Sequence, residues 1–207
     1  MITDTEKTRI ALYHWMLGKE YFIAAEAMAY AERTHVGFRK DGVTPAFAHQ
    51  IWIANRIRTF NLPNEIMETC LILAFLHDTA EDYDVGFEEF TAKYGSIISD
   101  GVRRLTKKHR GIVIPKETYF NDLSLMASAA IVKGVDRLHN LSTMVGVFKV
   151  EKQMAYIAET MLFHLPMLKI ARKNFPMYWQ AFESIKQAII DKIEMVQIIL
   201  KLETSNA

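Results

Sequence analysis

The chain has 207 residues, half of them hydrophobic, and its 25 Lys and Arg against 24 Asp and Glu give a formal net charge of +1. A near-neutral chain is not expected to be a general nucleic-acid binder or a membrane-surface protein, although a local cluster of charges could still bind a small anion. The length suits one domain with a substantial core, and it leaves the oligomeric state open.

The compartment is indicated by three features of the sequence. Cys70 is the only cysteine, so an internal disulfide is impossible and a reducing compartment is favoured. The first six residues, MITDTE, are too polar for a signal peptide. No apolar run approaches the length of a membrane span. We therefore predict a cytoplasmic protein.

The first half of the chain predicts helices interrupted by one irregular loop. Thr3 or Asp4 can cap the first helix. In the second helix, the expected apolar face includes Phe22, Ile23, Ala27 and Tyr30, which recur at roughly helical spacing. Segment 39–45 contains Gly and Pro, which break the pattern and predict a loop. The expected helices are 4–17, 20–35, 47–60 and one that starts at Pro63 and ends with the apolar run 70–76.

The second half continues the helical pattern, with no alternation typical of strands and no internal repeat. A basic group at 107–110 is followed by 111–115, the segment most expected to be a mobile loop. Pro166 can kink the helix that contains it. The expected helices are 87–93, 97–105, 151–175 and 177–202, with one long or broken helix over 116–144. We predict an all-α fold in a single domain, 1–207, with the C-terminal helix in 176–207 packing on the rest.

The stretch LAFLHDTAED, residues 73–82, carries the strongest chemical signal. His77, Asp78, Glu81 and Asp82 follow an apolar run at i,i+3 and i,i+4 spacings, so they converge on one side if the helix continues. Carboxylates at a helix C-terminus are disfavoured by the helix dipole, and a bound cation would reverse that cost. On this motif alone, an ordinary helix end with solvated acids remains an alternative.

A candidate metal set combines that motif with two other helices: His49, His77, Asp78 and Asp136. Two imidazoles and two carboxylates suit Mn²⁺, Fe²⁺ or Zn²⁺, and an octahedral ion would keep two positions for water and a substrate oxygen. Such an open site is catalytic in character. Taken singly, His49 could be a core histidine, and Asp136 could instead pair with an adjacent cation, Arg137 or Lys133.

Several segments, in a fixed order along the chain, together carry a resemblance to a known family. They are AYAERTH (29–35), RKDGVTP (39–45), His49, FLHDTAED (75–82), YG (94–95), LTK (105–107), KGVDRLHN (133–140), ET (159–160) and Pro166. Over about two thirds of the chain, this set resembles the hydrolase domain of the RelA/SpoT-type alarmone enzymes, most closely the stand-alone small alarmone hydrolases. These are HD-domain metal-dependent phosphohydrolases. The resemblance implies an HD-type helical bundle of about eight to ten helices without a substantial sheet.

The resemblance also implies an activity, that of an Mn²⁺-dependent 3′-pyrophosphohydrolase that degrades (p)ppGpp to GDP or GTP and pyrophosphate. The candidate metal set matches the ligands of the family, while Glu81 and Asp82 match the acids that orient the attacking water and accept its proton. Because the chain ends before a synthetase or regulatory domain could begin, we expect degradation of alarmone and not synthesis.

Four further residues match nucleotide-contacting positions of the family. Arg39 and Lys40 match a pair that lies along the nucleotide, where the arginine stacks on the base, and Asn140 and Thr143 match the ribose and 3′-phosphate side. The cations are physically reasonable, since the substrate is highly anionic and a guanidinium can stack on a purine. Without the surrounding motifs, residues 39–40 would be taken for a solvated loop, and 107–110 stays ambiguous between phosphate contact and simple exposure.

The chain departs from the family pattern at Ala46, where a tyrosine is usual, and at Gln50, where a proline is usual. The change at position 46 could alter the preferred purine. Two alternatives therefore stay open: a phosphohydrolase for another purine nucleotide, such as an adenosine alarmone or a phosphorylated dinucleotide, and a non-catalytic alarmone-binding protein. The remaining histidines discussed here are expected to be structural: His14, His35, His139 and His164.

Overall fold

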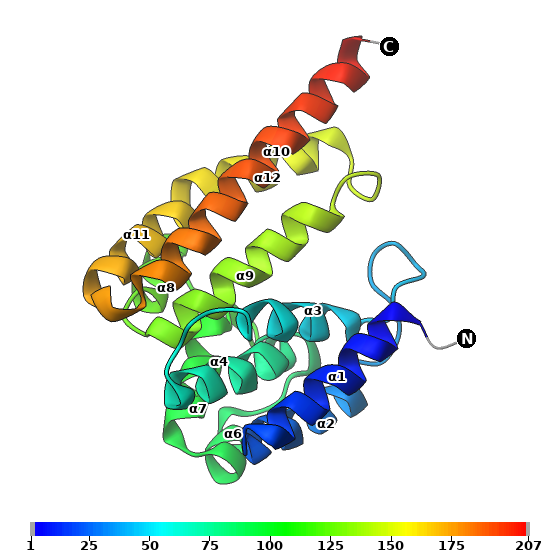
Figure 1. Ribbon diagram of the computed structural model, residues 1–207. Coiled ribbons are helices and arrows are strands. Elements are labelled where there is room, and N and C mark those ends of the chain that lie inside the picture. The colour runs from blue at the N-terminus through cyan, green and yellow to red at the C-terminus, as the bar shows by residue number, and fades with distance from the viewer. Residues whose placement is uncertain (1–2, 206–207) are drawn as a thin grey trace.

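The computed structural model describes residues 3–205, with side chains through Leu202, and almost all of this chain is helical (Figure 1). The helices are α1 (Asp4–Gly18), α2 (Phe22–Thr34), α3 (Ala48–Ile57), α4 (Asn64–Leu76), α5 (Thr79–Tyr83), α6 (Phe87–Tyr94), α7 (Ser96–Leu105), α8 (Lys116–Leu123), α9 (Ala127–Thr143), α10 (Val150–Glu159), α11 (Leu165–Asn174) and α12 (Trp179–Ser205), with a π-helical turn η1 (Thr160–His164) and a 3₁₀ turn η2 (Pro176–Tyr178). The all-α prediction is confirmed.

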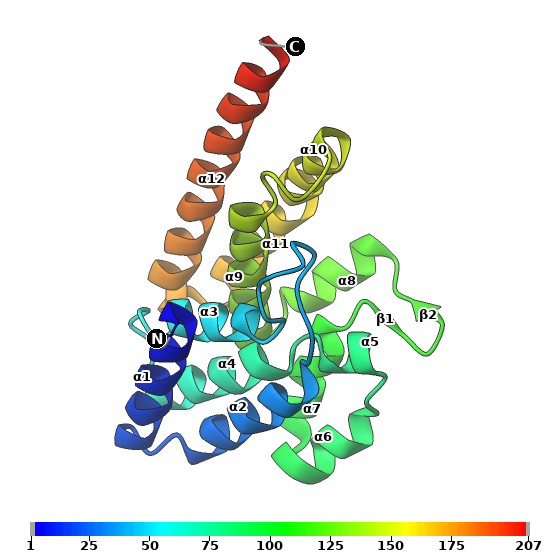
Figure 2. The ribbon, with the colours of Figure 1, turned by 90° about the vertical axis from the view of Figure 1, so that its right-hand side faces the viewer.

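A short hairpin replaces the mobile loop expected at 111–115. Strands β1 (Lys108–His109) and β2 (Ile112–Val113) pair antiparallel. The connecting residues, Arg110 and Gly111, both have positive φ angles, +48° and +81°. Two consecutive positive φ angles are typical of the tight turn that suits the twist of a hairpin. Figure 2 shows this hairpin protruding beside α5 and α8.

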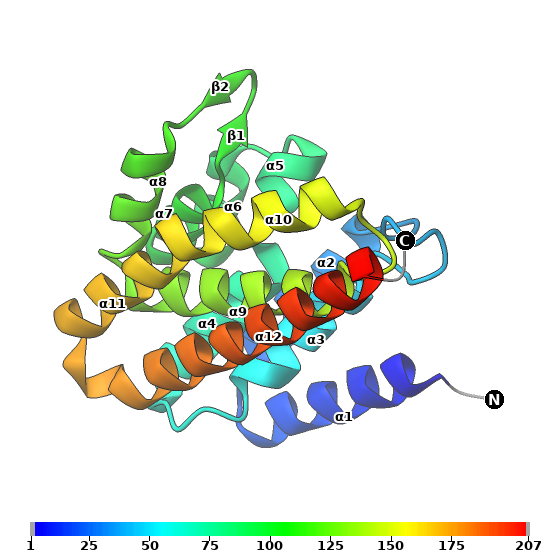
Figure 3. The same ribbon diagram turned by 90° about the horizontal axis from the view of Figure 1, so that it is seen from above.

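The core is organised around α4 and α9. Every residue of α4 from Cys70 to Leu76 is buried, which explains the uninterrupted apolar run. Helices α2, α3, α7 and α9 pack against α4, while α9 also contacts α8, α11 and α12. Figure 3 shows α9 between the segment of α10 and α11 on one side and α12 on the other. Each fully buried Leu or Phe contributes about 1.5–3 kcal/mol, so this contiguous cluster fixes the helices that carry the polar groups.

Helix α12 is the expected C-terminal helix. Its buried stripe packs on α9 and α11, and its last turns extend beyond the rest of the molecule (Figure 1). One continuous buried cluster runs from Leu12 to Leu200, which supports the single-domain organisation that we still hold as a prediction. Within the described residues, no helix combines the length and the apolar character that a membrane crossing requires.

The expected apolar face of α2 is confirmed for Ala27, which is fully buried, and for Tyr30, which packs against the core, but it is wrong for Phe22 and Ile23. Phe22 is 61% exposed and Ile23 is 49% exposed, whereas Ala24, Met28 and Ala31 are fully or almost fully buried. The buried stripe therefore starts two residues later than expected and consists largely of small side chains. Alanines let α2 approach α4 closely, and this packing places the two larger residues outside.

The helix expected to end with the run 70–76 does end at Leu76. His77 and Asp78 separate it from α5, so the motif 73–82 does not lie on one continuous helix. The segment 116–144 breaks between α8 and α9, and 151–175 contains η1. Pro166 is the second residue after η1 and has no N–H to donate to a preceding carbonyl, so the widened turn is where the missing hydrogen bond is accommodated. These breaks bring the number of α-helices in the described residues to twelve.

We expect Gly134→Val to destabilise the fold. A Cβ at Gly134 of α9 would lie 2.8 Å from Ile185 Cγ2 and 3.0 Å from Leu168 Cδ2, both in the core. Overpacking of this kind costs about 1–3 kcal/mol. Urea denaturation should show that loss, while Gly18→Val should be much milder, because a Cβ there meets no heavy atom within 4 Å in the described structure. Equal midpoints for the two variants would contradict the tight α9–α12 packing.

Candidate metal centre and adjoining cleft

A cleft of about 620 Å³ lies between the loop 35–47 and helices α3, α5, α9 and α10. All but one of the site residues expected from the sequence line it: Arg39, Lys40, His49, Asp78, Glu81, Asp82, Asp136, Asn140 and Thr143. The exception, His77, is buried beneath the cleft and contacts Asp78. The fold thus gathers residues separated by up to about a hundred positions into one region.

Three of the four candidate metal ligands form a tight group. His49, His77 and Asp78 each offer one ligand atom, and these atoms lie within 4.8 Å of one another. The Nε2 atoms of His77 and His49 are 3.0 Å and 3.9 Å from Asp78 Oδ2. The fourth candidate, Asp136, has its Oδ1 3.2 Å from His49 Nε2. The interruption between α4 and α5 places the His-Asp pair opposite α3.

The hydrogen bonding of His77 fits a metal ligand. Its Nδ1 lies 2.9 Å from the carbonyl oxygen of Ala74, which can only accept, so Nδ1 carries a hydrogen. Nε2 is buried and, although close to Asp78 Oδ2, makes no hydrogen bond of normal geometry. A ring fixed in this orientation by a carbonyl is typical of metal-binding histidines. With its mixed nitrogen and oxygen donors, the cluster can hold a divalent transition metal.

A proton on His77 balances the negative charge of Asp78. Burial lowers the pKa of His77, but the charge of Asp78 outweighs burial and raises the pKa to about 9. Burial likewise opposes ionisation of Asp78, yet the charge of His77 lowers its pKa to about 2. The buried carboxylates therefore require positive charge beside them, which a proton on His77 or a bound cation can supply.

Asp136 pairs with one of its two adjacent cations. Lys133 Nζ lies 2.9 Å from Asp136 Oδ2, and Asn140 Nδ2 donates to Oδ1 at 2.6 Å. Arg137 instead donates to Glu159 at 2.6 Å, with its Nε 3.0 Å from a histidine nitrogen on η1. Burial opposes ionisation of Asp136, but Lys133 holds its pKa well below the usual range. Both oxygens of Asp136 are thus oriented by neighbours.

The two acids after the His-Asp pair have different surroundings. Glu81 Oε2 accepts hydrogen bonds from the backbone N–H groups of Lys107 at 2.9 Å and Lys108 at 3.3 Å, which ties α5 to the hairpin. Burial, reinforced by the charges of Asp78 and Glu81, raises the pKa of Asp82 to about 6. Asp82 is therefore closer than an ordinary carboxyl to the pKa of an effective general base at neutral pH.

The nucleotide-contacting residues expected from the sequence connect to the metal cluster. Arg39 Nη2 donates to Asn140 Oδ1 at 3.0 Å, so a hydrogen-bonded chain runs from Arg39 through Asn140 to Asp136. The loop that carries Arg39 is closed by Asp41, whose Oδ1 accepts from the backbone N–H groups at 43 and 44. Thr143 lies one turn beyond Asn140 on α9, along the same cleft.

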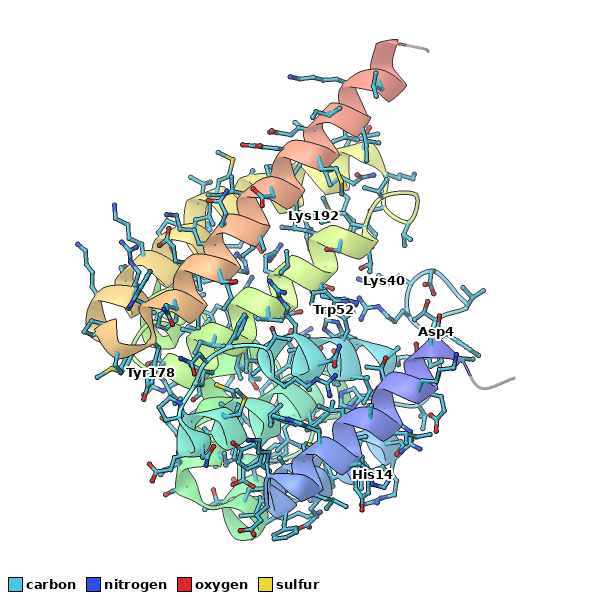
Figure 4. The ribbon with its side chains drawn as sticks, in the orientation of Figure 1. Asp4, His14, Lys40, Trp52, Tyr178 and Lys192 are labelled. Atoms are coloured by element: carbon cyan, nitrogen blue, oxygen red, sulfur yellow. The ribbon has the colours of Figure 1, made fainter. Side chains whose placement is uncertain are left out.

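A second cation stands beside Lys40. Lys40 Nζ lies 5.4 Å from the centroid of the Phe148 ring, and Lys152 Nζ lies 4.0 Å from the same ring. Burial and the charge of Lys152 lower the pKa of Lys40, so the pair is electrostatically strained without an anion. Figure 4 shows Lys40 extending from its loop toward the region of Trp52 on α3. Lys152 and Phe148 carry no motif signal in the sequence.

His139 was expected to be structural, and the structure places it against His49. Its Nδ1 lies 2.7 Å from His49 Nδ1, and its ring centroid is 4.6 Å from that of Trp52. Burial, followed by the nearby His49, lowers the pKa of His139 to about 3, so the ring is neutral. His139 is three residues after Asp136 on α9, and this helical spacing is the one signal that could have indicated it.

The other three histidines expected to be structural, His14, His35 and His164, show no hydrogen bond to a candidate ligand in the described residues. His35 Nδ1 lies 3.0 Å from the Ala31 carbonyl oxygen, and His164 Nε2 accepts from Arg137. His14 is exposed on α1. Their positions agree with the structural role expected for them, although His35 also lines part of the cleft.

Comparisons with known proteins were made for sequence and fold. No family model matches the chain. A Spiroplasma citri protein named guanosine-3′,5′-bis(diphosphate) 3′-pyrophosphohydrolase is 31% identical over 191 residues, which is 87% of this chain and 24% of that protein. A Streptomyces coelicolor GTP pyrophosphokinase is 29% identical over 143 residues, 66% of this chain and 16% of that protein. The chain thus spans a quarter or less of the length of these relatives.

The fold has a counterpart among solved structures. A structure described as a metazoan ortholog of SpoT that hydrolyzes ppGpp aligns with a TM-score of 0.63 and 18% identity, covering 84% of this chain and 94% of that one. This likeness shows the helical fold, and the His49–His77–Asp78 cluster is built into that fold. The named relatives confirm, more particularly, the resemblance to the RelA/SpoT-type proteins.

Proposed function

We propose that the protein is an Mn²⁺-dependent 3′-pyrophosphohydrolase that converts (p)ppGpp to GDP or GTP and pyrophosphate. The observation that carries the proposal is the cluster of two buried histidines, His49 and His77, with the half-buried Asp78, at the edge of a cleft that also presents cations and two further acids. The names of the Spiroplasma relative and of the structural neighbour support the substrate class. With one buried free cysteine, we place the enzyme in the cytoplasm.

The metal would be held by His49, His77, Asp78 and Asp136. When bound, a divalent ion supplies two effects, a lowered pKa of a water molecule and polarisation of a phosphoryl oxygen. Asp82 accepts the proton of the attacking water, since its raised pKa makes it a stronger base than an ordinary carboxylate. The water attacks the 3′-linked phosphorus, the bond from that phosphorus to ribose O3′ breaks, and O3′ leaves with the proton that Asp82 took from the water.

The cations of the cleft bind and orient the substrate. A guanosine bis(diphosphate) has several negative charges, and Arg39 and Lys40 line the cleft, with Lys152 on the same phenylalanine ring as Lys40. Relief of the repulsion between Lys40 and Lys152 would favour a phosphate between them. Glu81, anchored on the hairpin backbone, keeps α5 and therefore Asp82 in place.

We expect the rate to fall on the acid side with an apparent pKa near that of Asp82, which is about 6. A base must be deprotonated to act, so kcat/KM should rise through that pH and level off above it. The profile should be measured between pH 5 and 8 with Mn²⁺ saturating at every point. The residual kcat/KM of Asp82→Asn should not rise through this pH range. An unchanged rise in that variant would assign the titration to another group.

Arg39→Ala is expected to weaken substrate binding more than it slows the chemical step. Stacking and charge compensation act similarly on substrate and transition state, so KM should rise several-fold while kcat changes little. Arg33→Ala, an exposed arginine on the neighbouring α2, is the matched control. A large fall in kcat at constant KM would instead indicate that the Arg39–Asn140–Asp136 chain supports catalysis.

The proposal is tested by incubating the purified protein and Mn²⁺ with a panel of purine nucleotides that carry a 3′-diphosphate, followed by anion-exchange separation of products. Hydrolysis of the guanosine substrate, abolished by chelator and restored by Mn²⁺, is the expected result. Preference for an adenosine nucleotide would favour the alternative substrate, for which Ala46 in the cleft lining leaves room. Tight binding without turnover would indicate an alarmone-binding protein.

A further inference from the structure

The two facing imidazoles of His49 and His139 share one hydrogen. Their Nδ1 atoms are 2.7 Å apart, and the residues are 3% and 7% exposed. At this separation two N–H groups would clash and two lone pairs would repel, so one ring donates and the other accepts. Trp52 packs on His139 with a centroid distance of 4.6 Å and keeps the His139 ring in place.

The direction of that hydrogen bond decides whether His49 can bind a metal. If His139 donates, neutral His49 carries its hydrogen on Nε2, which lies 3.2 Å from Asp136 Oδ1. That arrangement suits a site without a cation, because an N–H then faces a carboxylate. If His49 donates, its Nε2 presents a lone pair to the same carboxylates, and only a cation between them makes this favourable.

We propose that His139 is a positioning residue that sets the tautomer of His49 and switches it when a divalent cation binds. Without the cation, His139 donates from Nδ1 and His49 holds a hydrogen on Nε2. With the cation, His49 donates from Nδ1 and His139 holds its hydrogen on Nε2. Each neutral ring carries one hydrogen in both states: one proton moves between the Nδ1 atoms, one leaves His49 Nε2 for solvent and one is taken up at His139 Nε2.

The other histidine of the cluster has no such switch. His77 Nδ1 faces the carbonyl oxygen of Ala74 at 2.9 Å, and a carbonyl cannot donate. His77 therefore always presents Nε2 to the site. For His49, the hydrogen on Nε2 depends on its neighbour on α9, His139. The inference rests on the divalent-cation site of the proposed function, but on neither the substrate nor the reaction.

The first test compares two substitutions at position 139. His139→Phe keeps an aromatic ring against Trp52 but removes the acceptor, whereas His139→Gln keeps an acceptor oxygen. Calorimetry with Mn²⁺ and with Zn²⁺ should show affinity about 10- to 100-fold weaker in the Phe variant, the usual effect of losing a partner of a ligand. The Gln variant should recover most of it. His35→Phe, which removes a buried imidazole that bonds a carbonyl elsewhere in the cleft, should leave the affinity unchanged.

The second test observes the tautomers directly. Nitrogen NMR of protein labelled at histidine, with diamagnetic Zn²⁺ added, should show the protonated nitrogen of His49 moving from Nε2 to Nδ1 and that of His139 moving the other way. Unchanged tautomers, or equal affinity in wild type and both variants, would overturn the role of His139 while leaving the metal site intact. Failure of the wild-type protein to bind either cation would overturn the inference together with the metal-dependent function.

Discussion

His77→Ala is expected to lose both its bound Mn²⁺ and its activity. His77 contributes a buried nitrogen that a carbonyl bond keeps pointed at Asp78, and alanine leaves that carboxylate without its ligand partner and without its positive neighbour. Metal content by atomic spectroscopy should fall to background, and turnover should fall by at least about 10³-fold, because the water then lacks the ion that acidifies it.

The fold of His77→Ala should survive, since the helical core does not depend on an ion to close. Far-UV circular dichroism of the variant should match that of wild type treated with chelator. His14→Ala, which changes an exposed histidine on α1, should retain metal and activity. Native turnover by a metal-free His77→Ala protein would remove this residue from the site.

The double variant Glu81→Gln/Asp82→Asn is expected to keep its metal and substrate but to hydrolyse about 10²- to 10⁴-fold more slowly, the usual effect of removing a general base. The substitutions preserve size and hydrogen-bonding shape while removing both charges. Asp82→Asn alone should account for most of the loss, because Asp82 has the raised pKa. Glu81→Gln keeps an oxygen that can still accept from the hairpin backbone at Lys107.

Metal analysis and nucleotide calorimetry on the same samples separate the possible roles of these acids. A native rate in the double variant would make them solvated residues of α5, and loss of metal would make them ligands. Glu117→Gln, an exposed acid on α8, controls for the removal of a surface charge.

The helices that the sequence predicted well are those with strong local signals. Thr3 caps α1, with its hydroxyl accepting from the N–H of Glu6, and Gly95 ends α6 with a φ of +84°. The apolar run of α4 is buried along its length. Capping and burial of a continuous apolar segment are local properties, so they can be inferred without knowledge of the neighbours.

The errors arise where packing decides. Phe22 and Ile23 fit an apolar stripe as well as Ala24 and Met28 do, and only the close approach of α4 selects the smaller residues for burial. The hairpin at 108–113 is too short for a recognisable alternation of side chains.

Much of the candidate site depends on contacts that no local pattern contains. The expected ligands were identifiable by residue type and by resemblance, but the hydrogen bond from Arg39 to Asn140 joins positions 101 apart in the sequence. The pairing of His139 with His49 spans 90 positions, and Lys152 reaches Lys40 across a phenylalanine. Such partners become visible only when the helices are assembled.

The central claim, cleavage at the 3′-linked phosphorus, is tested most directly by the products formed from ppGpp and Mn²⁺ in water enriched in oxygen-18. The account predicts equimolar GDP and pyrophosphate, with one heavy oxygen in the pyrophosphate and none in GDP, because water attacks phosphorus and the ribose oxygen leaves. Release of orthophosphate, label in the nucleoside, or recovery of intact ppGpp with metal-loaded protein would contradict it.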